Sequence, residues 1–327
     1  MKTFLKILGG LVGLIIVVAL IAVVALTLKK PDQRPASTEK IERTPERLER
    51  GKYLVQHVAG CLVCHSDHEN DRFSWPAKAG TEGQGGFEFD EKVGVPGAVC
   101  AQNITSDPEF GIGNWTDGEV VRAIREGVAN DGHALFPQMP YQLMRNIGDE
   151  DVKSIVTFIR TLPPIKKPTP PVRIDFPVSL LMKLAPKPVE GPVPVPKSSD
   201  GIVYGKYLAT MAGCFDCHTK LIKGNRPEEL AFSGGFDFKM PFVHAISANI
   251  TPDAETGIGN MTREAFIGRF KSFESLTELP KVTPSRQTVM PWKDYAGMTA
   301  EDLGAIYNYL RTVTPIKNKI VSFPDAT

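Results

Sequence analysis

The most apolar part of the chain lies near its amino terminus. Residues 7–28 contain no charged side chain, and at a helical rise of 1.5 Å they extend about 33 Å, enough to cross a hydrocarbon core of about 30 Å. The apolar run of a cleaved secretory signal is shorter, about 7 to 15 residues, and ends at a small-residue site that this segment lacks. We therefore expect an uncleaved membrane-spanning helix within residues 1–30, followed by a polar tether over residues 31–44.

Two later segments have apolar residues at the spacing of an amphipathic helix, i, i+3, i+4 and i+7. The positions are Val152, Ile155, Val156 and Ile159 in one segment, and Leu303, Ile306, Tyr307 and Leu310 in the other. Residues 116–119 and 299–302 have the form of capping boxes, in which side chains satisfy the free amides at a helix start. The pattern predicts a mainly α protein built from short helices.

The order of motifs along residues 45–165 recurs along residues 201–318. The matching segments are 51–54 with 205–208, 103–105 with 249–251, 111–114 with 257–260, and 139–140 with 290–291. A duplicated fold is the simplest cause. We call residues 45–165 the first repeat and 201–318 the second, and expect two tandem domains followed by a tail at 319–327. Gly51 and Gly205 are expected either to allow a close helix crossing or to break a helix.

The repeats are joined by a proline-rich linker, residues 166–200. Residues 163–200 contain eleven prolines, too many for a continuous helix or a central strand. The linker is therefore expected to be stiff and mostly extended. Its apolar stretch 178–185 can form a turn or two that packs on the protein surface or touches the membrane, and we expect surface packing.

Composition limits the remaining possibilities. The 327 residues, 42% apolar and 23% charged, suit two small globular domains. With 38 basic and 37 acidic residues the chain has a formal net charge of only +1, so a nucleic-acid partner is not expected. Five cysteines are present. Cys100 lies opposite Ile246 in the repeat, an apolar position, so it is expected to be buried and inert.

The other four cysteines belong to a motif that occurs twice, Cys-x-x-Cys-His. Two cysteines three apart lie on neighbouring ridges of one helical turn, where both thiols can reach the vinyl groups of a haem edge while the next histidine turns toward the iron. A zinc site would need a second ligand pair at finger-like spacing, and a thioredoxin-like pair would need a βαβ context. The sequence predicts two covalent haem c groups, held by Cys61, Cys64 and His65 and by Cys214, Cys217 and His218.

The sixth position of each iron decides between electron transfer and chemistry on a small ligand. Met139 and Met144 follow the first motif, and Met290 and Met298 follow the second. Only Met139 and Met290 fall opposite one another in the repeat, and each precedes a proline that suits a rigid loop. We expect these two as axial ligands. The remaining histidines have no counterpart in the other repeat and are expected at the surface or behind the ligands; they are His57, His68, His133 and His244. Of these, His133 is a weaker candidate for a hydrogen bond to a haem propionate.

Taken together, these motifs resemble a cytochrome c family, namely the membrane-bound cytochrome subunits of periplasmic alcohol and gluconate dehydrogenases and their di-haem relatives. The resemblance covers about residues 45–318, although those dehydrogenase subunits carry three haem motifs and this chain has two. It implies thioether bonds at the four motif cysteines and iron ligation by His65, Met139, His218 and Met290. It also implies a single-pass protein of the cytoplasmic (inner) membrane, with its haem domains in the periplasm.

The resemblance implies an electron carrier rather than an enzyme. Its redox partner would be a dehydrogenase or quinol-oxidising protein on one side and an oxidase or small cytochrome as terminal acceptor on the other. The alternative is a di-haem enzyme of the peroxidase or thiosulfate-oxidising type, in which one iron exchanges ligands with substrate. A Met-Pro in both repeats favours the carrier, because an enzyme is expected to leave one iron open or differently ligated. A haem-bearing structural subunit is a third possibility.

Overall fold

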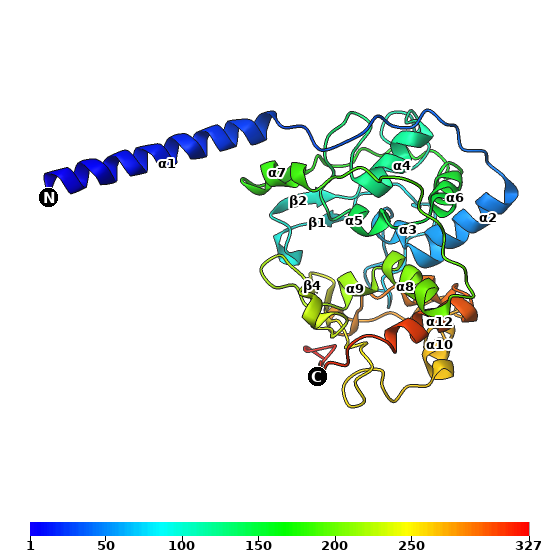
Figure 1. Cartoon of the computed structure of the whole chain (residues 1–327). Helices are drawn as coiled ribbons and strands as arrows, with labels where there is room; N and C mark the ends of the chain where they lie inside the picture. The colour runs from blue at the N-terminus through cyan, green and yellow to red at the C-terminus, as the bar shows by residue number, and fades with distance from the viewer. Residues whose placement is uncertain (327) are drawn as a thin grey trace.

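The computed structural model describes residues 1–326, and its regular structure is mainly helical, as predicted (Figure 1). The first helix, α1 (Lys2–Leu28), projects away from the rest of the molecule and buries none of its residues. Within the described part of the chain it alone is long and apolar enough to cross a membrane. Its length and composition are compatible with a membrane anchor and also with a signal sequence.

The α-helices and one pair of short strands follow one another in the same order in both repeats, whereas the short 3₁₀- and π-helices differ. The first has α2 (Pro45–Tyr53), the π-helix η1 (Leu54–Val58), α3 (Cys61–Cys64), β1 (Glu88–Phe89), η2 (Glu91–Val93), β2 (Gly97–Cys100), α4 (Asp117–Glu126), α5 (Tyr141–Met144) and α6 (Asp149–Ile159). The second has α8 (Gly201–Met211), α9 (Cys214–Cys217), η4 (Glu228–Leu230), β4 (Asp237–Met240), β5 (Val243–Ile246), α10 (Arg263–Lys271), η5 (Pro284–Arg286), α11 (Trp292–Ala296) and α12 (Ala300–Leu310). This correspondence is what the repeated motifs predict.

In each repeat the first helix crosses the last helix at very short range. Gly51 of α2 lies against the Ser154 carbonyl of α6, and Gly205 of α8 lies against the Ala305 carbonyl of α12. A Cβ atom at either glycine would overlap that carbonyl oxygen. Both glycines lie inside their helices, so the close-crossing prediction is confirmed and the helix-breaker alternative is wrong.

The two predicted capping boxes differ in the structure. Thr116 and Glu119 form a complete box at the start of α4. At the start of α12, Thr299 accepts a hydrogen bond from the Asp302 amide. The Asp302 carboxylate does not return this bond, because it accepts a hydrogen bond of 2.6 Å from the hydroxyl of Tyr53 in the other repeat. The second box is therefore only half formed.

The contact with Tyr53 is one of a reciprocal pair that joins the repeats. Tyr207 of the second repeat donates a hydrogen bond of 2.7 Å to the Asp151 carboxylate of the first. Arg50 also binds Asp151, through two hydrogen bonds of 2.8 Å each. Because each tyrosine extends from the first helix of one repeat to the last helix of the other, the two helix pairs are held against each other.

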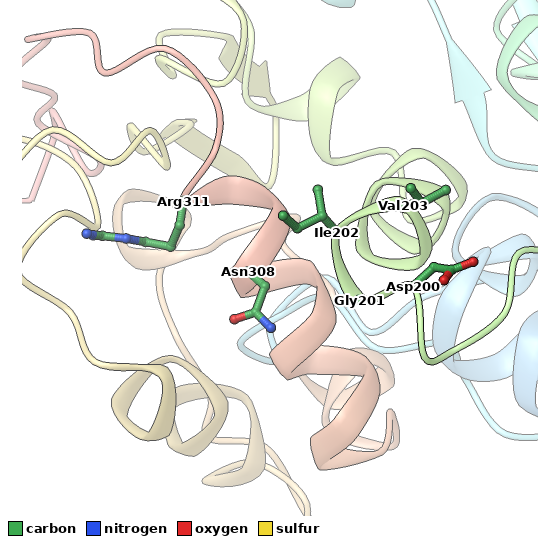
Figure 2. A pocket seen from close by; sticks show the side chains of 6 residues that line it. All are labelled: Asp200, Gly201, Ile202, Val203, Asn308 and Arg311. Atoms are coloured by element: carbon green, nitrogen blue, oxygen red, sulfur yellow. The ribbon is translucent and has the colours of Figure 1, made fainter.

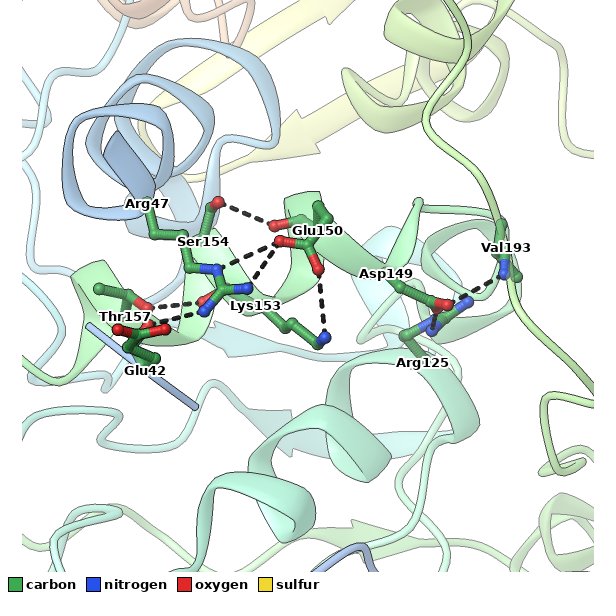
Figure 3. A network of polar contacts seen from close by, with 9 residues as sticks. All are labelled: Glu42, Arg47, Arg125, Asp149, Glu150, Lys153, Ser154, Thr157 and Val193. Atoms are coloured by element: carbon green, nitrogen blue, oxygen red, sulfur yellow. Dashed lines mark hydrogen bonds and ion pairs between the residues drawn. The ribbon is translucent and has the colours of Figure 1, made fainter. Parts of the chain in front are cut away.

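The start of α6 collects further polar contacts (Figure 3). Arg47 of α2 pairs with Glu150 at 2.8 Å, and Arg125 of α4 pairs with Asp149 at 2.6 Å. Asp149 also accepts a hydrogen bond from the amide of Val193 in the linker. Acidic residues in the first turn of a helix suit its positive end, and here they also fix two helices and the linker to α6.

The linker is mostly extended, as expected, but it contributes a short strand. β3 (Arg173–Ile174) pairs with β2, which also pairs with β1. Beyond it lie α7 (Val178–Leu181) and the 3₁₀ turn η3 (Met182–Leu184). We expected this stretch to pack on the surface, and α7 does contact β3, but it also contacts α1. Lys183 donates a hydrogen bond of 2.9 Å to the carbonyl of Thr27 at the end of α1.

Candidate haem sites

A cavity of about 670 Å³ lies inside the second repeat, within the size range of pockets that hold cofactors. Its lining is largely apolar and aromatic and includes Ile258, Phe270, Trp292 and Leu303. The same lining includes all four residues predicted for the second haem, namely Cys214, Cys217, His218 and Met290. These residues come from α9 and from the turn before α11, 72 positions apart in the chain. The structure thus brings the predicted thiols, imidazole and thioether to one cavity.

The histidines of the two motifs are oriented in the same way. His218 Nδ1 lies 2.8 Å from the carbonyl oxygen of Ala248, and His65 Nδ1 lies 2.6 Å from that of Gln102. Because Nδ1 donates to a carbonyl, the lone pair on Nε2 is free for a metal, which is the usual arrangement of a metal-binding histidine. Burial lowers the pKa of both histidines and so favours the neutral form that can bind iron.

The cysteines are positioned by a left-handed glycine at the start of each short helix, Gly60 before α3 and Gly213 before α9. Burial raises the pKa of Cys214 to about 12 and that of Cys217 to about 11. The Cys217 side chain is nevertheless accessible to solvent, because it borders the cavity rather than filling a packed core. In residues 1–326, no three His, Cys, Asp or Glu side chains are grouped so that they could hold a metal ion.

Each candidate methionine lies in a tight turn that leads into a short helix. The Trp292 amide donates a hydrogen bond of 2.8 Å to the Met290 carbonyl, and the Tyr141 amide donates one of 2.7 Å to the Met139 carbonyl. Of the two alternatives, Met144 is buried in the hydrophobic core. Met298 also borders the second cavity, so the cavity alone does not separate Met298 from Met290.

The first repeat contains a buried polar group without a partner. The Tyr141 side chain is 2% exposed, and its hydroxyl has no hydrogen-bond partner among the described residues. A buried hydroxyl without a partner is costly, and Tyr141 follows Met139 by two residues. Its counterpart, Trp292, lines the cavity of the second repeat. Cys61 and Met139 pack against the same hydrophobic core, so two of the residues predicted for the first haem share one apolar environment.

The four other histidines do not line the cavity of the second repeat. His68 is buried rather than exposed and stacks on Trp75 with ring centroids 3.6 Å apart, and burial lowers its pKa to about 4. His133 is exposed and bonds Asp131 at 2.6 Å. His57 and His244 bond the Asp294 carbonyl and the Asp325 carboxylate, respectively. Cys100 is buried, as expected.

A shallow depression of about 590 Å³ lies elsewhere, where α8 begins and α12 ends (Figure 2). Its lining consists of Asp200, Gly201, Ile202, Val203, Asn308 and Arg311. These residues offer neither a thiol, an imidazole nor a thioether. The depression therefore lacks the side chains that could hold a haem, which the cavity lined by His218 has.

The sequence analysis did not predict that Trp292 and Phe73 line the cavity. Trp292 belongs to the repeated Met-Pro-aromatic pattern, so that pattern could have indicated a lining role. Phe73 comes from the first repeat and lines the cavity of the second. Its segment matches none of the repeated motifs, so the repeat gave no signal for it.

No family model matches the chain, but curated proteins do. It is 27% identical over 281 residues to the cytochrome c subunit of a quinone-dependent alcohol dehydrogenase from Gluconacetobacter polyoxogenes. The aligned region covers 82% of this chain and 56% of the relative. It is 28% identical over 302 residues to the fructose dehydrogenase cytochrome subunit of Gluconobacter japonicus (88% and 57%). It is 30% identical over 172 residues to a dihaem cytochrome c-type protein of Cereibacter sphaeroides (50% and 54%).

The chain spans a little over half the length of these relatives. A gluconate 2-dehydrogenase cytochrome c subunit from Pantoea cypripedii is also similar, at 26% identity over 229 residues. The resemblance that the motifs predicted is thus confirmed: this chain is homologous to the cytochrome c subunits of alcohol, fructose and gluconate dehydrogenases and to a dihaem cytochrome c.

Proposed function

We propose that this protein transfers electrons through two covalently bound haem c groups, one in each repeat. The thioether sites are Cys61, Cys64, Cys214 and Cys217, and the iron ligands are His65, Met139, His218 and Met290. The observation that carries the proposal is the cavity of the second repeat, which is lined by both thiols, the imidazole and the thioether of one predicted set. The shared order of α-helices and paired strands extends the proposal to the first repeat.

The protein side chains have separable tasks in this proposal. Bound haem supplies an iron that accepts and releases one electron. The carbonyls of Gln102 and Ala248 hold the two imidazoles with Nε2 free. The apolar lining, including Ile258 and Leu303, excludes water and so favours the form of the site with lower charge. A methionine at the sixth position leaves no open coordination site for a substrate.

The proposed setting is the periplasmic face of the cytoplasmic membrane, with α1 as the single anchor. Partners would be a dehydrogenase or quinol-oxidising protein as donor and a terminal acceptor. The support is the similarity to cytochrome subunits of dehydrogenases together with the exposed apolar helix α1.

Redox titration of the haem-loaded protein in detergent tests the proposed function. We expect two one-electron transitions, low-spin spectra for both ferric haems, and negligible binding of carbon monoxide by the reduced protein, because both sixth positions are filled. Peroxide turnover should also be negligible. A high-spin haem in the native protein, or ready binding of carbon monoxide, would favour the di-haem enzyme instead.

Membrane fractionation tests the anchor. Because α1 carries no charge between Ile7 and Leu28, the full-length protein should sediment with membranes and resist carbonate extraction. The control variant lacks residues 1–30 and carries a cleavable signal, and we expect it to be red, folded and soluble. Recovery of the natural protein in a soluble form that starts after residue 28 would contradict the anchor.

A further inference from the structure

A segment of the first repeat, residues 69–75, extends onto the second repeat, and we call it the bridging segment. The Phe73 amide donates a hydrogen bond of 2.8 Å to the Pro280 carbonyl, and the Asp71 carbonyl accepts one of 2.8 Å from the Val282 amide. Arg72 and Lys281 form an antiparallel bridge between these bonds. The bridging segment is therefore attached, through its backbone, to the chain that leads toward Met290.

The bridging segment also contacts the Met290 turn itself, through Ser74. The Ser74 hydroxyl donates a hydrogen bond of 2.8 Å to the Met290 carbonyl and accepts one of 2.8 Å from the Trp292 amide. The Ser74 side chain is 4% exposed, so water does not readily replace either bond. One hydroxyl thus holds both ends of the turn that presents the Met290 thioether.

Two further contacts, made by Gln287 and Phe73, join the bridging segment to the second repeat. Gln287 is fully buried and donates hydrogen bonds to the carbonyls of Asn70 and Arg72, at 3.0 and 2.7 Å. Phe73 lines the cavity that contains His218 and Met290. The first repeat therefore supplies part of the wall of the second site as well as a support for its methionine turn.

Two residues of the bridging segment have a backbone conformation that is rare for residues other than glycine. Ser74 and Trp75 have φ angles of 67° and 52°, in the left-handed region that is unfavourable for residues other than glycine. Trp75 is fixed there by stacking on His68 and by a hydrogen bond of 2.8 Å from Nε1 to Asn70. Such conformations persist where surrounding contacts impose them, and they concentrate at functional sites.

Among the hydrogen bonds of residues 1–326, the first repeat supports the Met290 turn but the second repeat does not support the Met139 turn. The described backbone hydrogen bonds of the Met139 turn stay within the first repeat, from the Met139 amide to the Phe136 carbonyl and from the Tyr141 amide to the Met139 carbonyl. The Met290 turn has the equivalent internal bond and the two bonds to Ser74 in addition. The two sites thus differ in how firmly their methionines are held.

We propose that Ser74 is a positioning residue for Met290, so that the first repeat controls the axial ligation and the potential of the second iron. This inference rests on the proposed function, in which Met290 binds that iron. Firmer attachment of the Met290 turn keeps the thioether at the iron, and thioether ligation raises the potential. The second iron therefore exchanges its methionine less readily than the first.

The test compares Ser74→Gly with the unmutated, full-length, haem-loaded protein in detergent. Glycine keeps the left-handed backbone without strain and removes the CH₂OH side chain, and with it both hydrogen bonds to the Met290 turn. We expect a weaker long-wavelength absorption band of Met-ligated ferric haem and a lower potential for one of the two haems. We also expect roughly tenfold or more faster carbon monoxide binding by one reduced iron, because two buried hydrogen bonds to the Met290 turn are lost. Gln287→Leu, which removes the bonds to Asn70 and Arg72, should change all three in the same direction.

Asp71→Asn is the matched control. It lies in the same bridging segment, keeps the backbone bond to Val282 and loses only an exposed ion pair of 3.2 Å with Lys281, so it should behave as the unmutated protein. Equal changes in Ser74→Gly and Asp71→Asn would overturn a specific role for Ser74. If Ser74→Gly does not incorporate haem, Gln287→Leu decides the question by the same three measurements.

Met290→Leu separates the inference from the proposed function on which it rests. If Met290→Leu opens one iron to carbon monoxide while Ser74→Gly and Gln287→Leu change nothing, the positioning role is overturned and the proposed function stands. If Met290→Leu itself leaves the spectrum and the carbon monoxide reaction unchanged, Met290 is not the ligand and both proposals fail.

Discussion

Replacing Met290 by leucine should open the second iron to carbon monoxide. Leucine nearly conserves the volume of methionine, so the fold is expected to survive, but it cannot ligate iron. The ferric protein should lose about half of its weak long-wavelength absorption, since one of two Met-ligated haems is lost, and one of the two potentials should fall. Met139→Leu should do the same to the first iron. Optical spectra, redox titration and carbon monoxide binding measure the three effects.

Met144→Leu and Met298→Leu are the matched controls. Met144 packs in the hydrophobic core, and its replacement should leave both haem spectra unchanged. Met298→Leu is the more demanding control, because Met298 borders the same cavity as Met290. If Met298→Leu rather than Met290→Leu opens the iron, the ligand assignment from the repeat is wrong.

The parts of the fold that the sequence predicted are those set by local or repeated chemistry. The complete capping box depends only on Thr116 and Glu119, which are three residues apart. The amphipathic helices α6 and α12 can be recognised from apolar residues on successive turns of one segment. The close approach at Gly51 and Gly205 was also predictable, because a glycine at the same place in both repeats indicates a shared backbone contact. The incomplete box at Thr299 was not, since Asp302 bonds Tyr53, which is 249 residues away.

The residues of the candidate site also include some that the sequence could predict and some that it could not. Both thiols and the imidazole come from one helical turn, so their spacing in the sequence is enough to place them together. The place of Met290 at this cavity could be predicted because the Met-Pro pair occurs in both repeats, and its binding to iron stays a proposal. The bridging segment could not, because Ser74 reaches the Met290 turn through a left-handed backbone conformation that no turn signal in the sequence specifies. The wall formed by Phe73 follows from that same contact.

Replacing Gly205 by alanine should strongly destabilise the folded protein. The new methyl group would overlap the backbone carbonyl oxygen of Ala305, and a backbone atom cannot rotate away as a side chain can. Helices α8 and α12 must then separate, which opens the core around Leu208 and Leu303. We expect a destabilisation of about 3 kcal/mol or more, at the upper end of the range for overpacking. Thermal unfolding followed by circular dichroism in detergent measures it.

Gly268→Ala is the control for helix propensity. Gly268 lies within α10, and a Cβ atom there meets nothing within 4 Å. Alanine should therefore stabilise this helix by about 0.5 to 1 kcal/mol, because glycine loses more backbone entropy on folding. The two substitutions add the same methyl group to a helix and should shift the melting temperature in opposite directions. If Gly205→Ala were instead neutral, α8 and α12 could move apart without cost, and the close crossing would not be what holds the repeat together.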